Sequence, residues 1–381
     1  MKICLINNLY SPYTKGGAER IVSTTLDELG ALGHDVTVIT TKPYFVEKDN
    51  KSEFNIYRLR SLYWNLPDIP YVFRAFWHVW DNFNIINYFL VQSILKEEKP
   101  DVVFTHNLKG LGFLLPRAIN KLNIKTIHTL HDIQLLHPSG LLHLAKESVI
   151  DRSFASLYAK INIFLFSKVD LVISPSSWLL KMHTNKNFFT NIKQEVLLNP
   201  CKNETAHLSS IKKIENQVLF VGQIESHKGI FDLIKAFKQV DKKYNLVIIG
   251  DGSQTKNLEK TIKDHENISY IGKVNASEVA IKMRESALLV VPSKCYENSP
   301  TVIYEAYLAR VRVIASNIGG INEIVQSDFL FKAGDIVDLE NKIKGNFERR
   351  DVSLKDVFKF NPTNMNSQSY TKAIIDLIVG G

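Results

Sequence analysis

The chain has 381 residues and a formal net charge of +8 at pH 7, with 45% hydrophobic and 23% charged residues. This length exceeds what one hydrophobic core usually supports, so we expect about two domains, and the ordinary composition excludes a disordered chain. The mild basic excess suits an anionic small molecule, a phospholipid surface or nucleic acid. Nucleic acid ranks lowest, because the sequence holds no recognisable nucleic-acid-binding motif or basic run.

The start of the chain and the cysteine content indicate in which cellular compartment the protein is expected. The apolar run at 3–6 is only four residues long, which predicts a first strand rather than a signal peptide. Cys4, Cys201 and Cys295 are too few and too far apart for a disulfide framework or a metal site, which favours the reducing cytoplasm. The sequence holds no uncharged apolar stretch of about 18 residues, so any membrane contact is expected to be peripheral, at the inner face.

Short β-rich apolar runs alternate with helix-length amphipathic segments through the first half of the chain, which is typical of βαβ units on a parallel sheet. The strands expected there are 3–6, 35–40, 101–105, 124–130, 170–176 and 195–199, with a helix at 18–30. Polarity rises between Asn199 and Ile214, where we place the hinge between two domains.

A second alternating series follows the hinge and predicts a second doubly wound sheet. Its expected strands are 218–222, 245–250, 268–272, 287–292 and 311–315. The expected domains are therefore 1–200 and 201–362, with a C-terminal helix at about 363–381 packing back on the first domain. Ligands of such sheets bind at the carboxyl ends of the strands, so two facing sheets predict a central cleft.

Gly16 and Gly17 join the first expected strand to a helix that should begin near Ala18. Backbone N–H groups at a helix start favour an anion. A tight turn without any ligand would use the same two glycines, so the pair indicates an anion site only in combination with other motifs.

His131 follows directly on the expected strand 124–130, at the strand end where α/β proteins place their sites. A single His is more often structural than catalytic, and its position is the reason to single it out. His128 and His137 are less well placed.

The second half of the chain carries one candidate cation and two candidate carboxylates. Lys228 lies in the turn after the strand 218–222 and suits a phosphate, although many lysines are simply solvated. Pro300 suits the first turn of a helix, which places Glu297 in the loop before it and Glu305 on its second turn. Two carboxylates so placed could accept hydrogen bonds from a sugar and from a ribose; a helix-start acid and a solvated helix residue are the alternative.

Together these motifs resemble the retaining glycosyltransferases of family 4, which have the GT-B fold. The resemblance covers nearly the whole chain and is carried by Gly-Gly-Ala-Glu-Arg at 16–20, Leu-His-Asp at 130–132, Phe-Val-Gly through Lys228-Gly229, Gly-Asp-Gly at 250–252, the Glu297-x7-Glu305 pair and Gly-Gly-Ile-Asn-Glu at 319–323. It implies two Rossmann-like domains and transfer of a sugar from a nucleotide diphosphate donor, with a UDP-sugar favoured and GDP-mannose second.

The resemblance also implies roles for individual residues. Glu297 would grip the donor sugar, Glu305 the ribose and Lys228 the diphosphate, while His131 would lie near the reacting carbon. The donor-binding residues it implies are Gly16, Gly17, Gln223, Lys228, Lys273, Val274, Glu297, Asn298, Ser299, Pro300, Thr301 and Glu305, with Lys273 and Val274 reading the base. No Asp-x-Asp pair is present, which favours transfer without a metal or other cofactor.

Two departures from the family pattern limit the resemblance. Gln223 stands where many relatives carry Arg, so this position offers no positive charge to stabilise a diphosphate. Arg310-Val311-Arg312 replaces a Gly and a Pro, and we expect it to alter the local turn and to add positive charge near the donor.

The acceptor is expected to be a glycan or a lipid-linked glycan in cell-surface polysaccharide or glycoconjugate synthesis. An aromatic-rich segment at 63–89 is either packing core or a membrane-facing surface that would deliver such an acceptor. A nucleotide-sugar epimerase of the same fold and a non-catalytic sugar-nucleotide binding module stay open as alternatives. A dinucleotide-dependent oxidoreductase is disfavoured, because no G-x-G-x-x-G follows either first strand.

Overall fold

Two parallel sheets, each in its own unit, carry the fold. The computed structural model describes residues 1–13, 16–45, 54–202, 211–349, 352–361 and 365–380. The first unit comprises Met1–Leu141, Ser148–Pro200 and the C-terminal helix, and the second comprises Leu142–Glu147 with the described residues from Cys201 to Asn361. The expected α/β architecture of two Rossmann-like parallel sheets is confirmed.

The seven-stranded sheet of the first unit has the order β3-β2-β1-β4-β5-β6-β7, and all its pairs are parallel. The strands are β1 Lys2–Ile6, β2 Asp35–Lys42, β3 Asn55–Arg60, β4 Val102–Thr105, β5 Lys125–Thr129, β6 Leu171–Ser174 and β7 Lys193–Val196. The order reverses between β1 and β4, which makes this the switch point of the sheet. Strand β3 was not expected, because its charged residues and edge position leave no apolar run.

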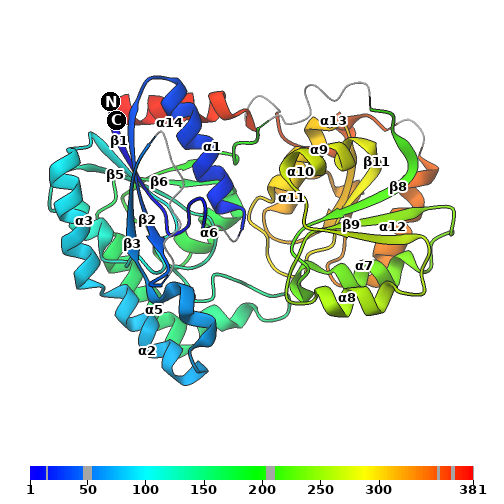
Figure 1. The fold of residues 1–381 in the computed structure, drawn as a ribbon, viewed down its shortest axis with the longest axis horizontal. Helices are drawn as coiled ribbons and strands as arrows, with labels where there is room; N and C mark the ends of the chain where they lie inside the picture. The colour runs from blue at the N-terminus through cyan, green and yellow to red at the C-terminus, as the bar shows by residue number, and fades with distance from the viewer. Residues whose placement is uncertain (14–15, 46–53, 203–210, 350–351, 362–364, 381) are drawn as a thin grey trace. The chain divides into compact units, whose positions relative to one another are not determined.

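Helices cover both faces of this sheet. They are α1 Ala18–Ala31, α2 Tyr71–Asn82, α3 Ile85–Glu98, α4 Leu115–Asn120, α5 Ser153–Phe166, α6 Ser177–Thr184 and α14 Ser367–Val379, with 3₁₀ turns at Leu62–Asp68 and Glu147–Asp151. Leu5 of β1 and Leu26 of α1 share one buried cluster with Tyr370 of α14, so α1 and α14 pack on the same face (Figure 1). On the opposite face, the ring of Phe166 in α5 lies 4.8 Å from His128 of β5.

The C-terminal helix α14 is tied to the first unit by polar contacts as well. Ser367 Oγ donates to Glu28 Oε1 of α1 at 2.5 Å, and Lys125 Nζ donates to the carbonyl of Ile378 at 2.6 Å. The C-terminal helix expected at about 363–381 is therefore present as Ser367–Val379, and it belongs to the unit that the chain starts with.

The second unit has a six-stranded parallel sheet of order β10-β9-β8-β11-β12-β13, with its switch point between β8 and β11. The strands are β8 Ile214–Val221, β9 Asn245–Ile249, β10 Ile268–Gly272, β11 Ser286–Val291, β12 Arg312–Ser316 and β13 Leu330–Phe331. The helices are α7 Ile230–Phe237, α8 Thr255–Ile262, α9 Ala276–Glu285, α10 Thr301–Leu308, α11 Ile321–Ile324, α12 Ile336–Glu348 and α13 Leu354–Val357, with 3₁₀ turns at Ser226–Lys228 and Ser327–Phe329. Strand β13 has two residues, too few for a sequence pattern to predict.

Leu142–Glu147 belongs with the second unit, although the sequence placed it within the first domain. Its backbone pairs with the loop after β11: Leu144 N donates to Lys294 O at 2.9 Å, and Tyr296 N donates to Leu142 O at 2.8 Å. Tyr296 Oη also donates to Glu147 Oε1 at 2.8 Å. These pairings join residues some 150 positions apart, which no local pattern reveals.

Candidate functional site

Lys228 and Glu297 meet at the switch point of the second sheet. Lys228 ends the 3₁₀ turn that follows β8, and Glu297 lies in the loop that follows β11, the strand beside β8. Lys228 Nζ lies 2.6 Å from Glu297 Oε1, and Ser293 Oγ donates to the same oxygen at 2.7 Å. Two residues that the sequence singled out 69 positions apart are thus brought into direct contact.

Both members of this pair are charged. Burial disfavours the ionised Glu297, but the Lys228 cation outweighs it and holds the pKa of Glu297 below its ordinary 4.5. Burial likewise disfavours the Lys228 cation, and the Glu297 charge outweighs it, raising the pKa of Lys228 above 10.5. Each side chain keeps part of its surface exposed, 26% for Lys228 and 15% for Glu297, so a ligand can reach both.

Two glycine loops hold the Glu297 loop in place. Gly229 has a φ of 74°, and a Cβ there would lie 1.7 Å from the carbonyl oxygen of Pro292. Gly319 has a φ of 62°, and a Cβ there would lie 2.3 Å from the carbonyl oxygen of Glu297, which accepts a 2.8 Å hydrogen bond from Gly320 N. Glycine is required at both positions for these close approaches.

Helix α10 begins directly after the Glu297 loop. Pro300 is its N-cap and Thr301 its first residue, so Glu305 stands on the second turn as the sequence predicted. Ser299 Oγ and Tyr304 Oη lie 2.5 Å apart and fix the start of the helix. The helix N-terminus therefore lies beside the Lys228–Glu297 pair, with its partial positive charge on that side.

The remaining candidates of the second unit follow other strand ends. Gln223 is exposed and follows β8, while Lys273 is exposed and follows β10, with the half-buried Val274 beside it. Glu225 accepts hydrogen bonds from Ser253 N at 2.7 Å and Ser253 Oγ at 2.8 Å, which joins the loop after β8 to the loop after β9. All these loops lie at the carboxyl edge of the sheet.

The expectation that Arg310 and Arg312 add charge near the donor is wrong. Arg312 begins β12, at the end of the strand away from the carboxyl edge, and donates to the carbonyls of Asn346 at 2.8 Å and Arg349 at 2.9 Å. Arg310 follows the C-terminus of α10, and its φ of 57° is the left-handed conformation that Gly adopts more readily. The turn is kept, and both arginines lie away from the start of α10.

In the first unit His131 forms a pair with His106. His131 follows β5 and is partly exposed, whereas His106 follows β4 and is only 2% exposed. Nδ1 of His106 lies 2.9 Å from Nε2 of His131. Burial lowers the pKa of His131 to about 4 and holds the pKa of His106 well below 6.5, so both rings are neutral at pH 7.

The environment of His106 favours one tautomer. Among the described residues, His106 Nε2 is buried and has no hydrogen-bond partner. A buried N–H without a partner is rarer than a buried acceptor without one, so Nε2 is the bare nitrogen and Nδ1 carries the proton. His106 Nδ1 then donates to His131 Nε2, and His131 carries its own proton on Nδ1.

The sequence singled out His131 but missed His106 and the two asparagines after β1. Asn8 N donates to Asn107 O at 2.8 Å, and Asn107 N donates to Asn7 Oδ1 at 3.1 Å, which joins the ends of β1 and β4 at the switch point. The available signal was position, since each of these residues directly follows a buried strand. His128, set aside in the sequence, lies within β5 and contacts Thr105 Oγ1 at 2.9 Å.

The Gly16-Gly17 loop precedes α1, which begins at Ala18 as predicted. Gly16 N donates to Glu19 Oε1 at 2.7 Å, so the carboxylate of the first helical turn occupies a backbone donor that the sequence assigned to a ligand anion. An incoming phosphate at Gly16 would have to replace Glu19.

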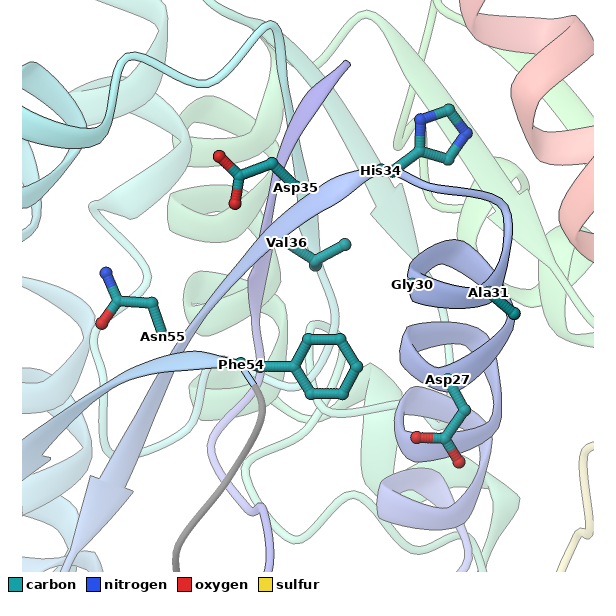
Figure 2. Close-up of a pocket in the computed structure, with 8 residues that line it drawn as sticks. All are labelled: Asp27, Gly30, Ala31, His34, Asp35, Val36, Phe54 and Asn55. Atoms are coloured by element: carbon teal, nitrogen blue, oxygen red, sulfur yellow. The ribbon is translucent and has the colours of Figure 1, made fainter.

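A pocket in the first unit lies away from these residues (Figure 2). It is lined by Asp27, Gly30, Ala31, His34, Asp35, Val36, Phe54 and Asn55, from the end of α1, the start of β2 and the start of β3. The start of β2 is at the edge of the sheet opposite His106 and His131. Two carboxylates in its lining also disfavour an anionic nucleotide.

Within the described part of the chain, no group of three or more His, Cys, Asp or Glu side chains is arranged to hold a metal ion. The helices among the described residues are also all too short or too polar to cross a membrane.

Comparisons with known proteins follow the division between the two units. Residues 203–353 match the family described as glycosyl transferases group 1, and residues 15–201 match glycosyltransferase family 4. The two matches together span most of the chain.

Two curated relatives and one solved structure illustrate the similarity. An uncharacterized 42.6 kDa protein in the cps region of Klebsiella pneumoniae is 27% identical over 334 residues, covering 85% of this chain and 87% of the relative. A putative teichuronic acid biosynthesis glycosyltransferase, TuaC of Bacillus subtilis, is 24% identical and covers 85% of this chain and 83% of the relative. HepE of Anabaena, solved with UDP and glucose, covers both chains fully with a TM-score of 0.68 at 17% identity, a likeness of fold.

Proposed function

The chain belongs to the family 4 glycosyltransferases of the GT-B fold, and on that basis we propose that it is a retaining, metal-independent hexosyltransferase. It moves a hexose or N-acetylhexosamine from a nucleotide diphosphate sugar to a glycan or lipid-linked acceptor. The contact between Lys228 and Glu297 beside the start of α10 carries this proposal, because it joins a cation for a diphosphate to a carboxylate for a sugar.

The donor is a UDP-sugar, with GDP-mannose as the second choice. The solved structure of HepE contains UDP and glucose, which favours UDP. The diphosphate lies against Lys228, Gln223 and the N–H groups at the start of α10, from Asn298 to Thr301. Glu305 accepts from the ribose, and the backbone of Lys273 and Val274 reads the base.

Transfer proceeds on the face from which the nucleoside diphosphate leaves. The bond between the anomeric carbon and the β-phosphate oxygen breaks, the acceptor oxygen bonds to that carbon, and the acceptor proton passes to the departing diphosphate. Negative charge grows on the diphosphate as the bond breaks, so Lys228 stabilises the transition state more than the ground state. Glu297 holds the sugar hydroxyls while this happens.

His131 contributes a hydrogen-bond donor from the first unit. In the tautomer that His106 favours, its Nδ1–H can hold a donor-sugar hydroxyl near the reacting carbon. Gly16 and Gly17 approach the donor phosphate and the acceptor, with the phosphate taking the place of Glu19 at Gly16 N.

Metal independence is supported by the absence of an Asp-x-Asp pair from the sequence and by the protein's own positive charge at the site. Lys228 and the start of α10 supply the stabilisation that a divalent cation gives in other enzymes.

The acceptor belongs to cell-surface polysaccharide or glycoconjugate synthesis. The Klebsiella relative is from a cps region and the Bacillus relative is assigned to teichuronic acid synthesis, which supports a polymer acceptor. A lipid-linked acceptor would be met through peripheral contact with the inner face of the membrane.

The test is a transfer assay with purified protein. Radiolabelled UDP-sugars and GDP-mannose are offered with glycan and lipid-linked acceptors, with and without EDTA, and the anomeric configuration of the product is read by NMR. We expect transfer with retention and no effect of EDTA. A changed sugar nucleotide formed without acceptor would assign the protein as an epimerase instead, and donor binding without any turnover would assign it as a binding module.

A further inference from the structure

Helix α2 presents an unusual apolar stripe to its surroundings. Phe73, Phe76, Trp80 and Phe83 follow one another at spacings of three and four residues, which places them on one face of the helix. All four side chains are exposed, and Phe76 reaches 71% exposure. Trp77, which lies four residues after Phe73 and three before Trp80, is buried. Within the aromatic segment 63–89, Trp77 therefore belongs to the core, and the four stripe residues lie at the surface.

Helices α3 and α5 extend this apolar surface. Ile86 and Phe89 of α3 are exposed, with Phe89 at 62%. Leu157 and Phe164 of α5 are also exposed, with Phe164 at 65%. The three helices lie on one flank of the first unit, at the lower left of Figure 1, and a hydrogen bond from Asn82 Nδ2 to Asn162 Oδ1 joins the end of α2 to α5. Exposed apolar surface of this extent marks an interaction site.

Two cations, Arg74 and Lys109, lie near the stripe, and Lys109 also lies near the carboxylates of Asp81 and Asp132. The positive charges of Lys109, His137 and Arg74 add to burial in lowering the pKa of His78, on α2, to about 4, so these groups lie close to one another. Lys109 Nζ donates to the carbonyl of Pro138 at 2.8 Å, which places it beside His137.

Carboxylates are few on the same helices: the exposed Glu97 and the half-buried Glu98 end α3, beyond its exposed apolar residues. Between residues 69 and 95 the only acidic residue is Asp81, which is buried, and between 153 and 166 there is none. An apolar face bordered by Arg74 and Lys109, with no acidic residue in its exposed apolar stripe, is complementary to a surface that is apolar inside and anionic outside. It disfavours a second copy of the same chain, because the two copies would bring equal positive charges together.

We propose that α2, α3 and α5 of the first unit dock on an anionic bilayer, with Phe76 and its neighbours among the lipids and Arg74 and Lys109 against lipid phosphates. Aromatic rings suit this boundary because one part of it is apolar and the other hydrated. The role of this docking, which is to bring the enzyme to a lipid-linked acceptor, rests on the proposed function. Binding to the bilayer itself does not depend on sugar transfer.

The experiment is co-sedimentation of the full chain with liposomes of phosphatidylcholine alone or mixed with phosphatidylglycerol, at low and high salt. We expect binding to the anionic liposomes that weakens with salt, and little binding to neutral ones. The double variant Phe73→Ser/Phe76→Ser should lower the partition coefficient about tenfold or more. Lys109→Glu should lower it about tenfold, through loss of an attraction and gain of a repulsion.

Matched controls separate docking from general effects. Phe45→Ser removes a Phe that is 93% exposed elsewhere in the same unit, and Lys193→Glu reverses an exposed charge on the edge strand β7. Both should bind liposomes like the unmodified protein. UDP binding and thermal unfolding verify that every variant is folded.

Three outcomes would overturn the proposal: no liposome binding by the unmodified protein, an equal loss in the control variants, or a concentration-dependent dimer abolished by Phe76→Ser without liposome binding. Liposome binding without any sugar transfer would leave the docking surface standing and reject the proposed function. Transfer to a soluble acceptor without liposome binding would reject the docking surface and leave the proposed glycosyltransferase function standing.

Discussion

Replacement of Glu297 by Gln separates the sugar-binding role of this residue from nucleotide binding. In the structure its Oε1 accepts from Lys228 Nζ at 2.6 Å and from Ser293 Oγ at 2.7 Å. Gln keeps the shape and one acceptor oxygen but removes the charge. A hydrogen bond to a charged group is worth about 1.5–3 kcal/mol, so loss of the carboxylate's bond to the sugar should lower kcat roughly ten- to hundredfold.

In the same variant, the affinity for free UDP should rise or stay unchanged. In the unliganded protein Glu297 competes with a diphosphate for Lys228, and Gln competes less because it carries no charge. We therefore expect UDP to bind the Glu297→Gln variant as tightly as the unmodified protein, or up to about tenfold more tightly. Isothermal titration with UDP measures the affinity, and a transfer assay at saturating donor measures kcat.

A matched ion pair supplies the control. Lys282 Nζ lies 2.8 Å from Glu285 Oε2 in the same unit, on the surface of α9. Exposed pairs contribute about 0–1 kcal/mol, so Glu285→Gln should alter neither kcat nor UDP affinity measurably. A more than tenfold loss of UDP affinity in Glu297→Gln, or an unchanged kcat, would refute the assignment of Glu297 to the sugar.

Four further changes test other residues. Glu305→Gln should weaken UDP binding roughly tenfold or more but leave the affinity for pyrophosphate, which has no ribose, unchanged. Competition titrations measure both affinities, and an equal loss for the two ligands would contradict a ribose contact. Gln223→Arg should tighten donor binding by adding a charge, and weaker binding in the same titration would show that the Gln is an adaptation of this loop. Burial raises the pKa of Asp81 from 3.8 to about 7, so the folded state keeps a proton that the unfolded chain releases, and stability falls as pH rises between these values. Asp81→Asn removes this loss, so the unfolding free energy of the variant relative to the unmodified protein should rise by about 2.6 kcal/mol from pH 5 to pH 8 in urea titrations. A difference that does not change with pH would argue against this. His106→Asn keeps a donor near the position of Nδ1 and should retain most turnover, whereas His106→Leu should lower it about tenfold and shift the ¹⁵N resonances of His131 to a mixed tautomer; unchanged resonances would leave His106 with a packing role alone.

The sequence by itself determined the features that depend on neighbouring residues. Alternation of strand and helix patterns predicted both parallel sheets, and each expected strand has a counterpart in them. Pro300 fixed the start of α10 and therefore placed Glu297 before the helix and Glu305 on its second turn. The end of the strand before His131 was enough to single out that residue. Each of these follows from local backbone geometry, which repeats every two or 3.6 residues.

Only the tertiary structure decided which distant groups meet. The sequence named Lys228 and Glu297 separately, and their contact arises because β8 and β11 are neighbours across the switch point of the sheet. It overlooked His106, since a buried His after a strand has no pattern of its own until β4 and β5 pair. The split of the aromatic segment into a buried Trp77 and an exposed Phe76 likewise depends on which face of α2 packs on the first unit. These outcomes are set by contacts between residues far apart in the chain, about which short-range spacing carries no information.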